Sequence, residues 1–134
     1  MDLRHRKGQA FLALVFFIGS IVAIVGILIA FLASSFVDTG YGVSSSALAE
    51  AAATSGAQDA MLQLNRNNNA SSSYSLPVGS TTVTIAISQN SPSAGYVTIL
   101  STASVSNHVR KVQVVLFVNT STTQTNVISW QDVQ

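Results

Sequence analysis

The chain has 134 residues, of which 8% are charged, and a mean hydropathy of +0.44. The absence of cysteine excludes disulfides, thiolate metal sites and cysteine nucleophiles. Three of the six basic residues lie in the first seven positions, and without residues 1–8 the three basic and four acidic side chains left give 3 − 4 = −1. Because nucleic-acid binding needs a clustered basic patch, we expect no nucleic-acid partner.

Residues 10–33 read AFLALVFFIGSIVAIVGILIAFLA, and no charge occurs from Gly8 to Val37. About 20 such residues cross a bilayer. Arg4 and Lys7 precede the run, so the positive-inside rule keeps the N-terminus cytoplasmic. We therefore expect a single-pass membrane protein whose remaining residues are extracytoplasmic, and membrane lipid as a partner.

A cleaved secretory signal is the alternative reading of this segment, because residues 30–35 resemble a small-residue cleavage site. The apolar run is, however, longer than the roughly 7–15 residues of an ordinary signal peptide. The sequence therefore favours a membrane helix over 9–37, preceded by a basic leader at 1–8.

Small residues recur along this helix at steps of 4, 3, 4 and 3. They are Gly19, Ala23, Gly26, Ala30 and Ala33. That spacing places them on one face, where small side chains let helices approach closely in lipid. The pattern predicts a helix-packing face, although Gly and Ala are also common in membrane helices without such a role.

Residues 38–69 form the next predicted region. Gly40 and Gly42 each lower helix stability by about 1 kcal/mol, which predicts a break or hinge. An amphipathic helix is predicted over 47–65, capped by one of Ser44 to Ser46 and ended by Arg66 and the asparagines after it.

The apolar stripe of that helix consists of Ala49, Ala53, Ala57, Ala60 and Leu64. Glu50 and Asp59 point to opposite sides of the helix, so they cannot form a pair of catalytic carboxylates. We interpret both as solvated surface charges.

Residues 70–134 are predicted to form a β-rich head. After a loop at 70–80, apolar and polar residues alternate over 82–87, 97–105 and 112–118, and a weaker fourth strand is expected at 126–133. Turns at 90–95 and 106–108 are short, which favours an antiparallel meander. One face of that sheet needs a cover, and the helix at 47–65 is the candidate, giving an α+β fold.

The sequence offers no catalytic, cofactor or metal motif. His108 falls at a predicted turn without a nearby acid or cysteine, so we interpret it as a surface residue. Tyr96 and Trp130 are expected to pack on the sheet, with partner binding as the alternative. We therefore predict a protein that is not an enzyme and binds no cofactor.

The order of these parts resembles the type IV pilin and type II secretion pseudopilin superfamily. The resemblance lies in the basic leader ending in Lys7-Gly8, the uncharged helix that follows at once, and the sheet after the second helix. Residues 49–64 are similar to the post-membrane helix of minor pilins, and residues 101–105 with 109–114 to their last strand pair.

The resemblance implies that a prepilin peptidase cuts between Gly8 and Gln9 and that the new N-terminus is methylated. It also implies that the helix leaves the bilayer for the core of a filament, with other pilin or pseudopilin subunits and an assembly-platform membrane protein as partners. Adhesion, motility, DNA uptake and secretion all stay open as the task of the filament.

Two positions depart from the family pattern. The family usually has Phe first after the cut and Glu at the fifth mature position, whereas this chain has Gln9 and Ala13. Because tip-located pseudopilins also lack that Glu, the sequence favours a minor or tip subunit. The alternatives are a single-pass anchor whose β-domain binds a surface ligand, and a cleaved secreted β protein.

Overall fold

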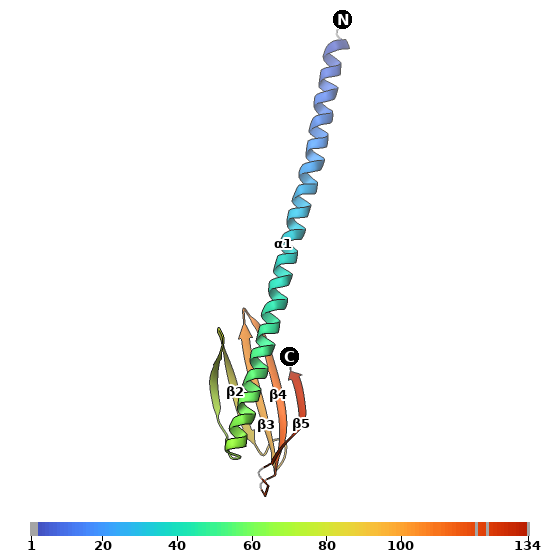
Figure 1. Cartoon of the computed structure of the whole chain (residues 1–134). Coiled ribbons are helices and arrows are strands. Elements are labelled where there is room, and N and C mark those ends of the chain that lie inside the picture. The colour runs from blue at the N-terminus through green and yellow to red at the C-terminus, as the bar shows by residue number, and fades with distance from the viewer. Residues whose placement is uncertain (1–2, 120, 123, 134) are drawn as a thin grey trace. The chain divides into compact units, whose positions relative to one another are not determined.

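The computed structural model describes residues 3–119, 121–122 and 124–133, with side chains from Ala10 onward. One helix is followed by five strands (Figure 1). The elements are α1 (Leu3–Arg66), β1 (Ser73–Val78), β2 (Thr81–Gln89), β3 (Tyr96–Val105), β4 (His108–Asn119) and β5 (Gln124–Val133).

The chain divides into two compact units, one ending at Tyr41 and the other beginning at Gly42. α1 contributes residues to both units and is helical through Gly40 and Gly42, so the break expected there is not found. Two glycines cost only about 1 kcal/mol each, and propagation of a helix that already exists is favourable. Whether these glycines act as a hinge stays a prediction.

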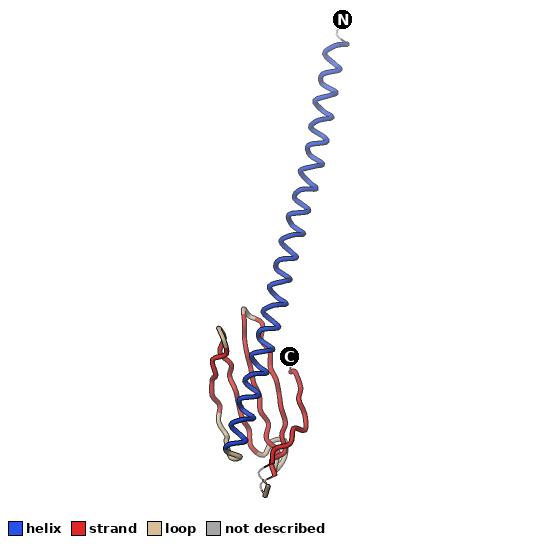
Figure 2. The backbone as a smooth tube through the Cα atoms, viewed as in Figure 1, coloured by secondary structure: helices blue, strands red, loops and turns tan. Residues whose placement is uncertain are grey.

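The five strands form one antiparallel sheet in the order β1-β2-β3-β4-β5. Figure 2 shows short connections between successive strands, as the closely spaced turns predicted. The second unit is therefore an antiparallel meander covered on one face by the end of α1, and the predicted α+β class is confirmed.

The core lies between α1 and the covered face of β2, β3 and β4. All five residues of the predicted stripe on α1 are fully buried. They pack with alternate residues of the three strands, among them Ile85, Ile99 and Val114. The small side chains of the alanines let α1 lie close to the sheet, so the helix and the strands share one dry core.

Gly56 marks the closest approach of α1 to the sheet. A Cβ at this position would lie 2.5 Å from the Ser101 hydroxyl and 2.7 Å from Val83 Cγ1. Ser101 is itself fully buried, and its hydroxyl has no hydrogen-bond partner within the part of the chain that the structure describes. A glycine is therefore required here by space rather than by backbone conformation.

The loop predicted at 70–80 is wrong, because Ser73–Val78 forms β1 and pairs with β2. Pro77 is tolerated because β1 is an edge strand with partners on one side only. A two-residue turn at Gly79 and Ser80 joins the strands, with Gly79 at φ +60°. The Val-Gly-Ser-Thr sequence is a hairpin signal that reveals this strand.

The fourth predicted strand is present as β5, at the other edge of the sheet. Val115 pairs with Ser129 but Leu116 pairs with Val127, which leaves Ile128 as a bulge. Directly paired residues point to the same side of a sheet. Val127 and Trp130 therefore both lie on the face that α1 covers elsewhere, although they are three residues apart.

Candidate functional site

The first unit presents an apolar helix surface with no cover of its own. The helix Ala10–Arg66 contains a window of mean hydropathy 3.0, and none of that window is buried inside the protein. Side chains from Phe11 to Val37 are exposed along its length. By length and composition, this segment is suited to spanning a bilayer.

The predicted packing face is open along its whole length, since Gly19, Ala23, Gly26, Ala30 and Ala33 are all exposed. An added Cβ at Gly19 or Gly26 would meet nothing within 4 Å.

A shallow depression of about 450 Å³ surrounds Gly19, lined also by Leu12, Val15, Phe16 and Ser20. The Ser20 hydroxyl donates to the carbonyl oxygens of Phe16 at 3.0 Å and Phe17 at 2.8 Å. Because its one polar group is satisfied within the helix, this face is compatible with lipid or with another helix.

Gly8 and Gln9, the expected cleavage positions, lie in α1. Their side-chain surroundings fall outside the described part of the chain, as do those of all residues before Ala10. Cleavage and methylation at this junction stay predictions.

The start of the second unit is held by the end of the β3–β4 hairpin. Arg110 donates to Ser46 Oγ from Nε at 2.9 Å and from Nη2 at 2.6 Å. The ring of exposed His108 lies over Gly42, where a Cβ would be 3.7 Å from Nε2.

The expected helix cap at Ser44 to Ser46 is therefore wrong, because these residues are inside α1 and Ser46 accepts a bond from β4. The surface position predicted for His108 is confirmed.

Asp59 is not the solvated charge that the sequence predicted, whereas Glu50 is exposed as expected. The Tyr74 hydroxyl of β1 donates to Asp59 Oδ2 at 2.7 Å, and Gln63 Nε2 donates to the same oxygen at 3.1 Å. Burial raises the pKa of the Tyr74 phenol, and the bond to Asp59 and its negative charge raise it further. This pair ties the edge strand β1 to α1.

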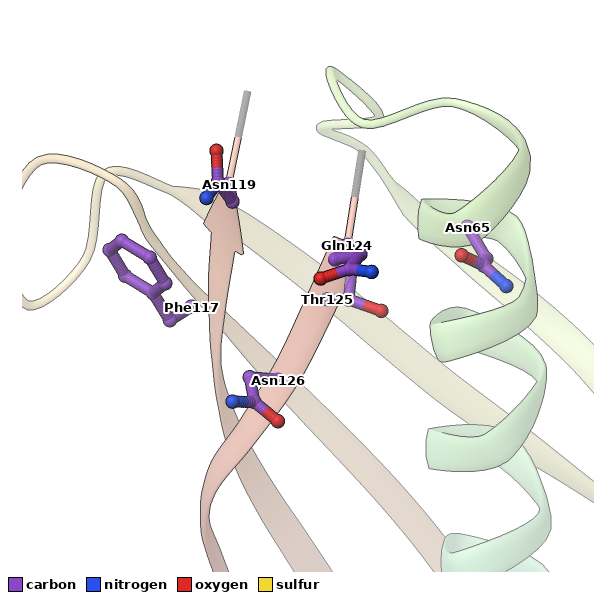
Figure 3. Close-up of a pocket in the computed structure, with 6 residues that line it drawn as sticks. All are labelled: Asn65, Phe117, Asn119, Gln124, Thr125 and Asn126. Atoms are coloured by element: carbon purple, nitrogen blue, oxygen red, sulfur yellow. The ribbon is translucent and has the colours of Figure 1, made fainter. Parts of the chain in front are cut away.

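An open depression of about 570 Å³ lies where the β4–β5 hairpin meets the end of α1 (Figure 3). It is lined by uncharged residues, namely Asn65, Phe117, Asn119, Gln124, Thr125 and Asn126. Within the described structure, the amides of Asn65, Gln124 and Asn126 make no side-chain hydrogen bond. The lining residues come from both faces of the hairpin, and the depression is open. Because the lining is uncharged, it suits hydrogen bonding to a ligand.

Tyr96 and Trp130, the two aromatic residues expected to pack on the sheet, differ in their contacts. Tyr96 packs edge-to-face on Phe117, with ring centroids 5.3 Å apart. Trp130 lies on the sheet as expected but is 43% exposed, so both readings made from the sequence stay open for it.

Within the described residues, no three His, Cys, Asp or Glu side chains gather in a way that could hold a metal ion.

No protein-family model matches this chain, and comparisons with curated proteins and with solved structures give no match either.

Proposed function

We propose that this chain is a structural subunit of a type IV pilus-like or type II secretion filament, held in a membrane before assembly. The observation that carries the proposal is the exposed apolar surface of α1 from Ala10 to Val37. Such a surface must be covered by lipid or by other protein. The open row of small residues suits cover by a helix of another protein as well as cover by lipid.

The second unit supports this assignment because it needs no further cover for its core. Its part of α1 already has its apolar stripe buried by the sheet. The same helix thus has two parts. Residues 10–37 are exposed and can contact a membrane or other subunits, and residues 49–64 pack against the sheet of the head. The prepilin peptidase, the assembly-platform protein and related subunits are the partners that go with this function.

Leader cleavage tests the proposal. N-terminal sequencing with a prepilin peptidase should begin at Gln9, and without the enzyme at Met1. Gly8→Leu should keep the leader, whereas the same change at Gly40, which has open space around it, should leave cleavage intact. A mature N-terminus at Met1 in the presence of the peptidase, or one near Ala33, would contradict the proposal.

A second function is favoured by the uncharged depression at the β4–β5 hairpin. Its unpaired amides suit a neutral hydrogen-bonding ligand, as in a single-pass protein whose head binds a surface ligand. That function requires residues 1–8 to persist in the membrane fraction and Gly8→Leu to be tolerated.

A further inference from the structure

The two edges of the head carry apolar features of opposite shape. At the β5 edge, Trp130 and Val127 lie on the same face of the sheet as α1, and they are 43% and 52% exposed. In Figure 1, α1 crosses the sheet over β2, β3 and β4, and β5 lies beyond it. The Trp130 side chain is therefore partly exposed at this edge of the sheet.

At the opposite edge, a groove of about 250 Å³ lies between α1 and the β1–β2 hairpin. We call it the Leu48 groove. Its lining includes Leu48, Ala51 and Ser55 from α1 and Val78, Gly79 and Thr81 from the hairpin.

Two of the three hydroxyl groups that line the Leu48 groove, those of Ser55 and Thr81, already donate hydrogen bonds. Ser55 Oγ donates to the Ala51 carbonyl at 2.9 Å, and Thr81 Oγ1 donates to the Ser104 carbonyl at 2.8 Å. No charged side chain lines the groove. It therefore suits an uncharged, largely apolar occupant of about one large side chain, since small-molecule pockets usually hold roughly 300–1,000 Å³.

We propose that the Leu48 groove of one copy receives Trp130 of a second copy of this chain. Projection and groove are on opposite edges of one sheet, so the contact is head-to-tail. It leaves the first copy with a free projection and the second copy with a free groove. This proposal deepens the proposed function, on which it rests, by naming a contact between heads.

The positions of the two features also set an offset between copies. Val105 of the groove pairs with His108, whereas Trp130 pairs with Val114, six residues further along β4. Six residues span roughly 20 Å of strand. A copy that seats its Trp130 is thus displaced along the strands, which favours an open helical array over a closed ring. Such repetition places the chain in a shaft, in contrast to the tip position that Ala13 suggests.

Cysteine cross-linking tests this contact without background, because the chain has no cysteine of its own. Two differently tagged copies are expressed together, one carrying Ser55→Cys and the other Val127→Cys, which lies on the same face as Trp130 and leaves the ring in place. Oxidation should join them into a mixed dimer. Replacing Ser55→Cys by Val109→Cys, which is 51% exposed on the uncovered face of the sheet, should abolish the product.

Fluorescence gives a second measurement, since Trp130 is the only tryptophan in the chain. Its emission should shift to the blue on assembly, and Leu48→Trp, which fills the groove, should prevent the mixed dimer in a chain that still folds. A blue shift in dilute membranes without any mixed dimer would mean that Trp130 enters lipid, and the proposal would be wrong.

Leader sequencing on the same samples separates this proposal from the proposed function. Filaments that contain a correctly cut chain but give no mixed dimer would overturn the Trp130 contact alone. A mixed dimer from uncut, membrane-held protein would support the contact and count against the filament function. The absence of both would contradict both.

Discussion

The two segments of α1 both carry a row of small residues but meet different surroundings. From Ala10 to Val37 the apolar side chains are large and exposed, and the small residues form the recessed row. From Ala49 to Leu64 the small residues are themselves the buried stripe, under the sheet. The difference teaches that the same spacing of small residues can lie open on one segment of a helix and under a sheet on the next.

The largest expected effect comes from breaking the external stripe. Gly19→Leu with Gly26→Leu should abolish recovery of the chain in filaments while leaving it in the membrane, because the added side chains keep neighbouring helices apart. Ile21→Phe with Leu28→Phe, on the opposite face, is the matched control. Equal loss of filaments from both pairs, measured by filament shearing and immunoblotting, would show that bulk alone matters.

The internal stripe should respond as a protein core. Leu64→Ala should lower the free energy of unfolding of the head by about 2–5 kcal/mol, because it leaves a cavity in a fully buried site. Leu62→Ala, at a residue 59% exposed, should change it by less than about 0.5 kcal/mol. Denaturant titration in detergent, followed by Trp130 fluorescence, measures both; similar values would contradict the burial described for Leu64.

Tyr74→Phe tests the bond that ties β1 to the internal segment. Loss of the bond to the Asp59 carboxylate should cost about 1.5–3 kcal/mol. Because the folded state raises the pKa of Tyr74, this residue contributes stability that is fully present below pH of about 10 and is lost as the pH rises further. The variant should therefore lose less stability than the parent in alkaline unfolding titrations, and an equal loss in the two proteins would contradict the bond between Tyr74 and Asp59.

Ser101→Ala should have the smallest effect on the free energy of unfolding. The sign of that effect shows whether the buried hydroxyl has a polar partner. Removing a buried hydroxyl that has no partner among the described residues should leave stability unchanged or raise it by about 1 kcal/mol. Ser104→Ala, at an exposed position on the same strand, should stay within about 0.5 kcal/mol of the parent. A clear loss of stability in Ser101→Ala would mean that its hydroxyl has a polar partner.

The sequence predicts much of this fold because hydrophobic periodicity reports burial directly. The stripe ending at Leu64 and the alternation over 97–105 both predicted the buried side chains of their elements. It missed β1 because serines and Pro77 conceal the alternation of Tyr74, Leu76 and Val78. It predicted a helix cap at one of Ser44 to Ser46, and it did not predict the bond from Arg110 to Ser46 because local patterns do not contain a contact between residues 64 apart.

Of the surfaces proposed for function, one could be predicted from the sequence and two could not. The row from Gly19 to Ala33 follows from spacing alone, since a helix fixes which side chains share a face. The Leu48 groove does not, because it exists only where a helix meets a hairpin from 30 residues later. The side of β5 that carries Trp130 was equally hidden, since strict alternation would place Val127 and Trp130 on opposite faces.

The bulge at Ile128 inserts one extra residue into β5 and shifts the alternation of its side chains by one position. Deleting that residue would restore regular alternation and still leave Trp130 opposite Val114, on the same side of the sheet as Val127. A lineage can therefore gain or lose one residue at this point without changing the surface to which its largest aromatic side chain belongs.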